Sequence, residues 1–169
     1  MSIAVVAGNP KPKSRTLAAG ILLAETLTGS TPDLVIDVID LGPGLLGWGD
    51  PAVTEAVSAV AKSDVVIVAS PTFKATYTGL LKLFLDQIPT DGLAGVYALP
   101  LMLGAGPGHA LAPELLLKPV LVELGAITPA RGLYLIDKTF TEDPQLVAYA
   151  DRVRPLLPKS AGLPISQGE

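Results

Sequence analysis

Short apolar runs alternate along the chain with longer segments in which apolar residues recur every three or four positions. The short runs are rich in Val, Ile and Leu, and Val65-Val66-Ile67-Val68 is apolar on both faces. A strand covered by helices on both sides of a parallel sheet has this composition. The runs predict five strands, at Ile3–Ala7, Leu34–Ile39, Asp64–Ala69, Tyr97–Leu103 and Gly132–Ile136.

The longer segments predict a helix after each strand. They lie at Thr16–Leu27, Ala52–Lys62, Gly79–Ile88, Ala110–Leu124 and Pro144–Leu157. Pro89 and Gly125 are placed to end the third and fourth of these helices, because Pro disfavours the helical conformation of the residue before it and Gly caps helix C-termini.

Five strand–helix alternations with right-handed crossovers predict an α/β fold. We expect a doubly wound, five-stranded parallel sheet in three α/β/α layers, with the flavodoxin-like strand order 2-1-3-4-5. Residues 1–169 contain no internal repeat or linker and are interpreted as a single domain. The segment 159–169 contains Gly, Ser and Pro, and we expect it to be a loosely ordered tail.

Composition narrows the class of function. The net charge of −4 and the pI of about 4.9 provide no global basic field, which disfavours nucleic-acid binding. The chain has no cysteine and one histidine, which disfavours a metal enzyme. The first apolar run is too short for a signal peptide or a membrane span, so a cytoplasmic protein is expected.

The predicted strand order places a ligand at one edge of the sheet. In this topology a ligand lies over the carboxyl ends of the first and third strands, beside the loops that follow the first, third and fourth. These loops are GNPKPKSRT at 8–16, SPTFKATYT at 70–78 and GAGPGH at 104–109, and they are the most unusual stretches of the chain.

The loop GNPKPKSRT has the composition of an anion site. It lacks the second glycine of the mononucleotide GxxxxGK[ST] loop and the GxGxxG pattern of dinucleotide sites. Hydroxyl groups and free N–H groups at a helix start suit one terminal phosphate. The candidate phosphate-binding residues are Gly8, Asn9, Ser14, Arg15 and Thr16.

The loop after the third strand continues into SPTFKATYTGLLKLFLDQIP, which resembles a stretch typical of NADPH-dependent FMN reductases. The resemblance extends through LPLMLGAGPGHALAPELLLKPVLVELGA and includes GNPKPKSRT, so that it spans Ile3 to Asp137. It is nearest to the reductase components of two-component alkanesulfonate monooxygenase systems. Where those reductases often carry an aromatic residue or His six positions after the glycine-loop His, this chain has Leu115.

The resemblance implies an FMN site with NADPH or NADH as the reductant. Backbone groups after a central strand can bind the flavin, and a glycine-rich wall admits the nicotinamide. No residue is assigned as catalytic, because hydride transfer is the chemistry of the cofactors; His109 is a candidate contact to flavin or nicotinamide. The residues that this reading adds to the site are Pro71, Thr72, Phe73, Lys74, Tyr77, Gly104, Ala105, Gly106 and His109.

Three functions remain open from the sequence. An FMN reductase passing reduced flavin to a partner monooxygenase is favoured. An enzyme that retains FMN and reduces quinones or azo dyes, and an electron carrier without a substrate, are the alternatives. Apolar residues exceed one core-facing stripe at 79–88 and 115–124, so a homodimer or homotetramer is expected.

Overall fold

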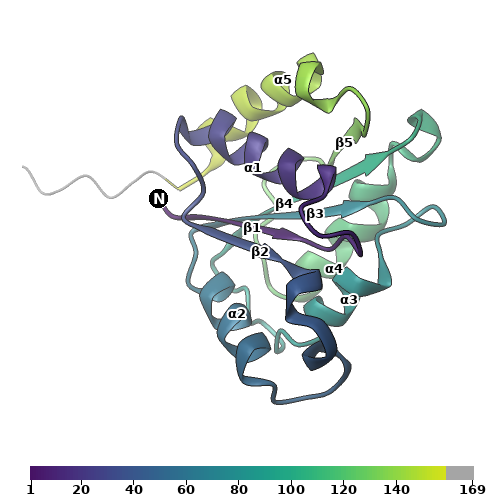
Figure 1. The fold of residues 1–169 in the computed structure, drawn as a ribbon. Helices are drawn as coiled ribbons and strands as arrows, with labels where there is room; N and C mark the ends of the chain where they lie inside the picture. Colours follow the sequence, from purple (N-terminus) through teal and green to yellow (C-terminus); the bar gives the residue numbers. More distant parts are fainter. Residues whose placement is uncertain (159–169) are drawn as a thin grey trace, which may run out of the picture.

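The protein is a three-layer α/β/α structure in the computed structural model, which describes residues 1–158 (Figure 1). The expectation for 159–169 lies outside the described residues. The strands are β1 (Ile3–Ala7), β2 (Leu34–Asp37), β3 (Val65–Pro71), β4 (Tyr97–Gly104) and β5 (Leu133–Ile136). They are parallel in the order β2-β1-β3-β4-β5, which confirms the predicted topology.

The helices cover both faces of the sheet. They are α1 (Arg15–Thr28), α2 (Pro51–Ala61), α3 (Gly79–Leu85), α4 (Lys118–Glu123) and α5 (Pro144–Val153). Helices α1 and α5 lie on one face, and α2, α3 and α4 lie on the other (Figure 1).

The alternation of side chains along the strands builds two separate cores. In β1, Val5 packs toward α1 and α5 while Val6 packs toward the opposite layer. All five residues of β1 and all seven of β3 are buried, as their two-sided apolar composition predicts. These central strands form the rigid base from which the ligand-side loops project.

The predicted helix at 110–124 is wrong as one continuous element. A 3-10 turn at Pro107–His109 precedes a π-helical turn at Pro113–Leu117, and α4 then covers only Lys118–Glu123. The backbone N–H of Lys118 reaches back to the carbonyl of Pro113, five residues earlier. Pro119 accounts for the wide turn, because a proline has no N–H and its ring collides with the carbonyl four residues before it.

Three other predicted elements end early, one of them the helix predicted to reach Ile88, which ends at Leu85. The strand predicted to reach Ile39 ends at Asp37 and passes into a 3-10 segment at Val38–Leu46, kinked at Gly42. The last predicted helix ends at Val153, and a 3-10 turn containing Pro155 follows. Within the described residues, no helix is long and apolar enough to cross a membrane.

Candidate functional site: a pocket at the carboxyl ends of the strands

A pocket of about 520 Å³ lies where the loops after β1, β3, β4 and β5 meet. Its position is the one that the strand order predicts, at the reversal between β1 and β3. The structure brings together most of the predicted site residues on its walls: Asn9, Ser14, Arg15, Thr16, Pro71, Thr72, Phe73, Gly104 and Ala105.

The start of α1 forms one end of the pocket. Ser14 is the N-cap, and its Oγ accepts a hydrogen bond from the N–H of Leu17 at 3.2 Å. Thr16 is buried, and its Oγ1 accepts a hydrogen bond from Asn9 Nδ2 at 2.9 Å. A hydroxyl that accepts a bond still has a proton to donate, so both side chains remain available to an anion at the helix start. The first N–H groups of the helix also lack partners within it.

Cations surround this end of the pocket. Lys11, Lys13 and Arg15 line it, and Arg15 Nη2 lies 2.9 Å from Asp137 Oδ2 in an ion pair on the exposed side. Lys13 has a left-handed backbone with φ of 50°, and its N–H donates to Asp37 Oδ2 at 2.8 Å. The buried Asp37 therefore holds the loop in a conformation that a non-glycine residue rarely adopts. Burial raises the pKa of Asp37.

Two residues that line this pocket each carry a buried polar atom without a hydrogen-bond partner among the described residues. These atoms are Thr72 Oγ1 and Asp137 Oδ1. A buried polar atom without a partner is costly, and a ligand that supplies the missing partner recovers that cost. FMN fits these residues. Its phosphate suits the cationic end of the pocket, and its ribityl hydroxyls and ring edge can form hydrogen bonds with the unpartnered oxygens of Thr72 and Asp137.

The loop after β3 is a tight hairpin. Phe73 and Thr76 exchange backbone hydrogen bonds at 2.9 and 3.2 Å around the two-residue turn Lys74-Ala75. Both turn residues have positive φ, 51° and 71°. A turn of this kind normally contains Asn and Gly, so the hairpin is strained. It holds Phe73, whose surface is 50% exposed, at the pocket wall.

Two predicted site residues, Gly8 and Tyr77, pack against the interior and do not line the pocket. Gly8 packs against α3, where an added Cβ would lie 2.7 Å from Leu81 Cα. Its carbonyl accepts a hydrogen bond from Thr78 Oγ1 at 2.6 Å. Tyr77 packs against the core on the side of α2, α3 and α4. Both therefore position the loops, and neither lines the pocket.

The glycine loop after β4 is shaped by a tyrosine that the sequence analysis did not select. Tyr134 on β5 donates a hydrogen bond from its hydroxyl to the carbonyl of Gly106 at 2.8 Å. A Cβ at Gly104 would lie 2.7 Å from Tyr134 Cζ, so only glycine fits there. Gly106, a predicted site residue, is bound to Tyr134 in this way and does not line the pocket.

His109 and Lys74 are also separate from the main pocket. His109 is exposed and lines a neighbouring hollow with Ala75, Leu111, Leu115 and Leu116. Lys74 is exposed at the tip of the hairpin. Among residues 1–158, no group of three or more His, Cys, Asp or Glu side chains is placed to hold a metal ion.

The sequence analysis also missed residues that line the pocket, chiefly Lys13, Leu103 and Asp137. Asp137 directly follows β5, and the carboxyl ends of parallel strands share one edge of the sheet. That rule was applied to the loops after the first, third and fourth strands, and applying it to the fifth would have found Asp137.

Comparison with known proteins identifies the family. The family of NADPH-dependent FMN reductases matches residues 1–141. The chain belongs to this family. The FMN reductase (NADPH) of Escherichia coli strain K12 is 31% identical over 156 residues, covering 90% of this chain and 78% of that protein. The NADH-dependent FMN reductase SfnF of Pseudomonas fluorescens strain Pf0-1 is 30% identical, covering 84% of this chain and 80% of that protein.

A solved structure agrees with the FMN reductase assignment. The apo form of an NADH:FMN oxidoreductase is 34% identical and has a TM-score of 0.84, covering 95% of this chain and 91% of that chain. The resemblance stated from the sequence motifs is therefore confirmed, as is the flavodoxin-like fold. The predicted cofactors, FMN with NADPH or NADH as reductant, are those of the family and of the named relatives.

Proposed function

We propose that this chain is a cytoplasmic NAD(P)H-dependent FMN reductase that binds FMN in the pocket at the carboxyl ends of the strands. The observation that carries the proposal is the pair of buried, unpartnered oxygens, Thr72 Oγ1 and Asp137 Oδ1, in a pocket whose other end is a cationic helix start. A ligand with a phosphate at one end and polar atoms along its length satisfies both features. We propose the cytoplasm as the location because the proposed reductant, NADPH or NADH, is a metabolite of that compartment.

The phosphate of FMN is assigned to the start of α1. Ser14 and Thr16 each have a hydroxyl proton to donate, as described above, and the first N–H groups of α1 add the helix dipole. Arg15 also lines this end of the pocket, and its exposed guanidinium can exchange Asp137 for phosphate. That exchange is cheap, since an exposed ion pair contributes about 0–1 kcal/mol.

Bound FMN supplies the redox chemistry by accepting a hydride from the reduced nicotinamide. The residues of this chain bind and orient the two molecules and provide no catalytic acid or base. Gly104 and Ala105 form a low wall, which leaves room for a second ring. We assign Phe73 to the flavin edge, because the strained hairpin holds it at the pocket wall, while Lys74 lies at the exposed tip of the same hairpin.

The reduced flavin is proposed to leave for a partner monooxygenase. Support comes from two relatives, the FMN reductase (NADPH) of Escherichia coli and SfnF of Pseudomonas fluorescens, whose names give FMN as the substance reduced. The alternatives are a retained-FMN quinone or azo reductase and an electron carrier. Turnover that saturates with added FMN, and exceeds turnover with added quinone, is expected. Steady-state oxidation of NADPH is expected for either kind of reductase and not for an electron carrier.

We also propose a homodimer or homotetramer. Leu115, Leu116 and Val122 are 61%, 41% and 53% exposed on the segment that contains the π-helical turn and α4. Exposed apolar side chains in such a cluster are typical of an interface between subunits. A sedimentation experiment at micromolar concentration is expected to show no stable 17.4 kDa monomer.

The function is tested by the absorption spectrum of the purified protein with added FMN, followed by NADPH or NADH without oxygen. The flavin band is expected to bleach, and a chelator is expected to leave the rate unchanged. Activity that is lost on chelation and restored by a divalent ion would contradict the proposal. No bleaching with either nicotinamide would contradict it as well.

A further inference from the structure

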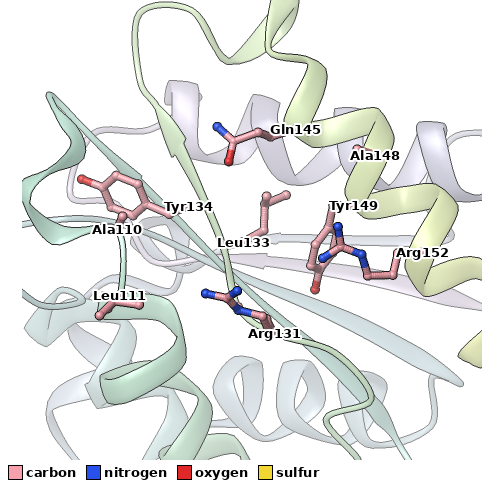
Figure 2. Close-up of a pocket in the computed structure, with 10 residues that line it drawn as sticks. Ala110, Leu111, Arg131, Leu133, Tyr134, Gln145, Ala148, Tyr149 and Arg152 are labelled. Atoms are coloured by element: carbon pink, nitrogen blue, oxygen red, sulfur yellow. The ribbon is translucent and has the colours of Figure 1, made fainter.

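A second hollow, of about 350 Å³, lies between β5 and α5 and shares no lining residue with the flavin pocket. We call it the β5–α5 pocket. Figure 2 shows its side chains, which come from α5, from β5, from the segment that leads into β5 and from Ala110 and Leu111 after β4. The lining residues on α5 are Gln145, Ala148, Tyr149 and Arg152, whose spacing of three and four places them on one face of the helix.

The β5–α5 pocket is bordered by three exposed side-chain donors that have no partner within the described part of the protein. The side chains of Arg131, Gln145 and Arg152 make no hydrogen bond or ion pair with any residue in the described range 1–158. In contrast, Arg15 is paired with Asp137 and Arg154 with Asp151. Two guanidinium groups left unpaired around one hollow attract an anion, since each can bind two oxygens at once.

The buried hydroxyl of Tyr149 is independent evidence for a ligand in the β5–α5 pocket. Its side chain is 6% exposed, and its hydroxyl is buried without a hydrogen-bond partner among the described residues. In Figure 2 the ring extends from α5 toward the segment that leads into β5, where Arg131 lies. Burial, together with the charge of Glu114, raises the pKa of Tyr149, so the hydroxyl keeps its proton and is a donor that lacks an acceptor.

The local charge also favours an anion. The carboxylate whose charge reaches Tyr149, that of Glu114, pairs with Lys118 at 2.9 Å and accepts a bond from the N–H of Gly132 at 2.7 Å, and it also feels the charge of Arg131. That second bond holds the turn that carries Arg131. Because Glu114 and Lys118 neutralise each other, the charges of Arg131 and Arg152 leave the β5–α5 pocket with a net positive charge.

We propose that the β5–α5 pocket binds the phosphate or sulfate group of a small molecule. A group with three terminal oxygens offers more acceptors to Arg131, Arg152, Gln145 and Tyr149, which line one hollow, than a carboxylate with two oxygens in one plane. Leu111, Leu133 and Ala148 supply an apolar wall for the rest of the molecule. The source of the group is either a free small oxyanion or the 2′-phosphate of NADPH.

The test follows the side-chain Nε–H signals of the arginines by NMR during a titration with inorganic phosphate at constant ionic strength. FMN is added first, so that the flavin pocket is filled. Saturable shifts of the Arg131 and Arg152 signals are expected. If FMN fails to move the Arg15 signal, the proposed flavin site fails, but the β5–α5 pocket is still judged on Arg131 and Arg152 alone.

Variants make the assignment specific. Arg131→Gln and Arg152→Gln are each expected to weaken phosphate binding at least tenfold, while Lys62→Gln, which removes one positive charge at the end of α2 on the other face of the sheet, leaves it unchanged. Tyr149→Phe is expected to raise the melting temperature, because it removes an unpaired buried hydroxyl, and yet to weaken phosphate binding several-fold.

The proposal is overturned if phosphate produces no saturable shift, if Lys62→Gln weakens binding as much as the arginine variants, or if Tyr149→Phe leaves the affinity unchanged. Adenosine 2′-monophosphate, with adenosine as its control, identifies the source. Binding at least tenfold tighter than inorganic phosphate supports the 2′-phosphate of NADPH, and equal binding supports a free oxyanion.

Discussion

Replacing Gly8 by alanine tests how closely the chain after β1 approaches α3, beneath the proposed flavin pocket. Gly8 has no positive φ, so the new side chain meets only a problem of space. Its Cβ would lie 2.7 Å from Leu81 Cα, whereas carbon atoms in contact sit about 3.5–4.0 Å apart. Helix α3 must therefore move away, and the bond from Thr78 Oγ1 to the Gly8 carbonyl is stretched.

The cost is the sum of overpacking, about 1–3 kcal/mol, and one lost hydrogen bond, about 0.5–1.5 kcal/mol. Gly8→Ala is thus expected to lower the free energy of unfolding by about 1.5–4.5 kcal/mol, or the melting temperature by roughly 3–18 °C. The matched control is Gly79→Ala, where an added Cβ meets nothing within 4 Å. Alanine there is expected to be neutral or to stabilise by up to about 1 kcal/mol.

Urea unfolding of both variants without flavin measures the difference, so the result does not depend on ligand binding. A Gly8→Ala protein within about 0.5 kcal/mol of wild type would refute the reasoning.

Three further predictions concern the same region. Arg15→Ala and Ser14→Ala are expected to weaken FMN about ten- to hundredfold and riboflavin far less, as measured by titration with both flavins; equal losses would exclude the phosphate assignment. Ser14→Ala should also cost about 0.5–2 kcal/mol of stability, because Ser14 caps α1. Asp37→Ala is expected to cost about 1–3 kcal/mol by leaving the Lys13 N–H unpaired, whereas Asp37→Asn keeps an acceptor. Because the pKa of Asp37 is raised, its contribution to stability falls as pH rises from about 4, and unfolding measured against pH should lose that slope in Asp37→Asn. Ala75→Gly should raise the free energy of unfolding by about 0.5–1 kcal/mol, measured by thermal unfolding, because glycine adopts the positive φ of this position without the strain of an alanine side chain. An unchanged stability would mean that the turn is not strained.

The strands and their order could be predicted because the information is local. The runs at Ile3–Ala7 and in β3 are apolar on both faces. In a chain that alternates strands with helices, this pattern indicates central strands of a parallel sheet with helices on both sides. The helix predicted at 110–124 failed for an equally local reason, which was overlooked. Pro119 lies within the periodic pattern of apolar residues, and the pattern does not reveal the wide turn that a proline requires.

The site was predictable where one loop supplies its residues, and not where the sheet brings distant segments together. Ser14, Arg15 and Thr16 could be placed from nine consecutive residues. Tyr134 lies in β5 and Asp137 directly follows it, and only the pairing of β5 with β4 shows that both meet the glycine loop. Gly8 is a third case, since no local pattern distinguishes a glycine that meets a ligand from one that meets a helix.

The strained hairpin at Phe73–Thr76 has a thermodynamic consequence for ligand binding. Its two left-handed residues are held in place by backbone bonds before any ligand arrives, so the conformational cost is charged to folding. Binding then does not have to order this loop. Calorimetry of flavin binding should accordingly show a heat-capacity change set by the apolar surface that is buried, without the additional entropic penalty of a segment that folds as it binds.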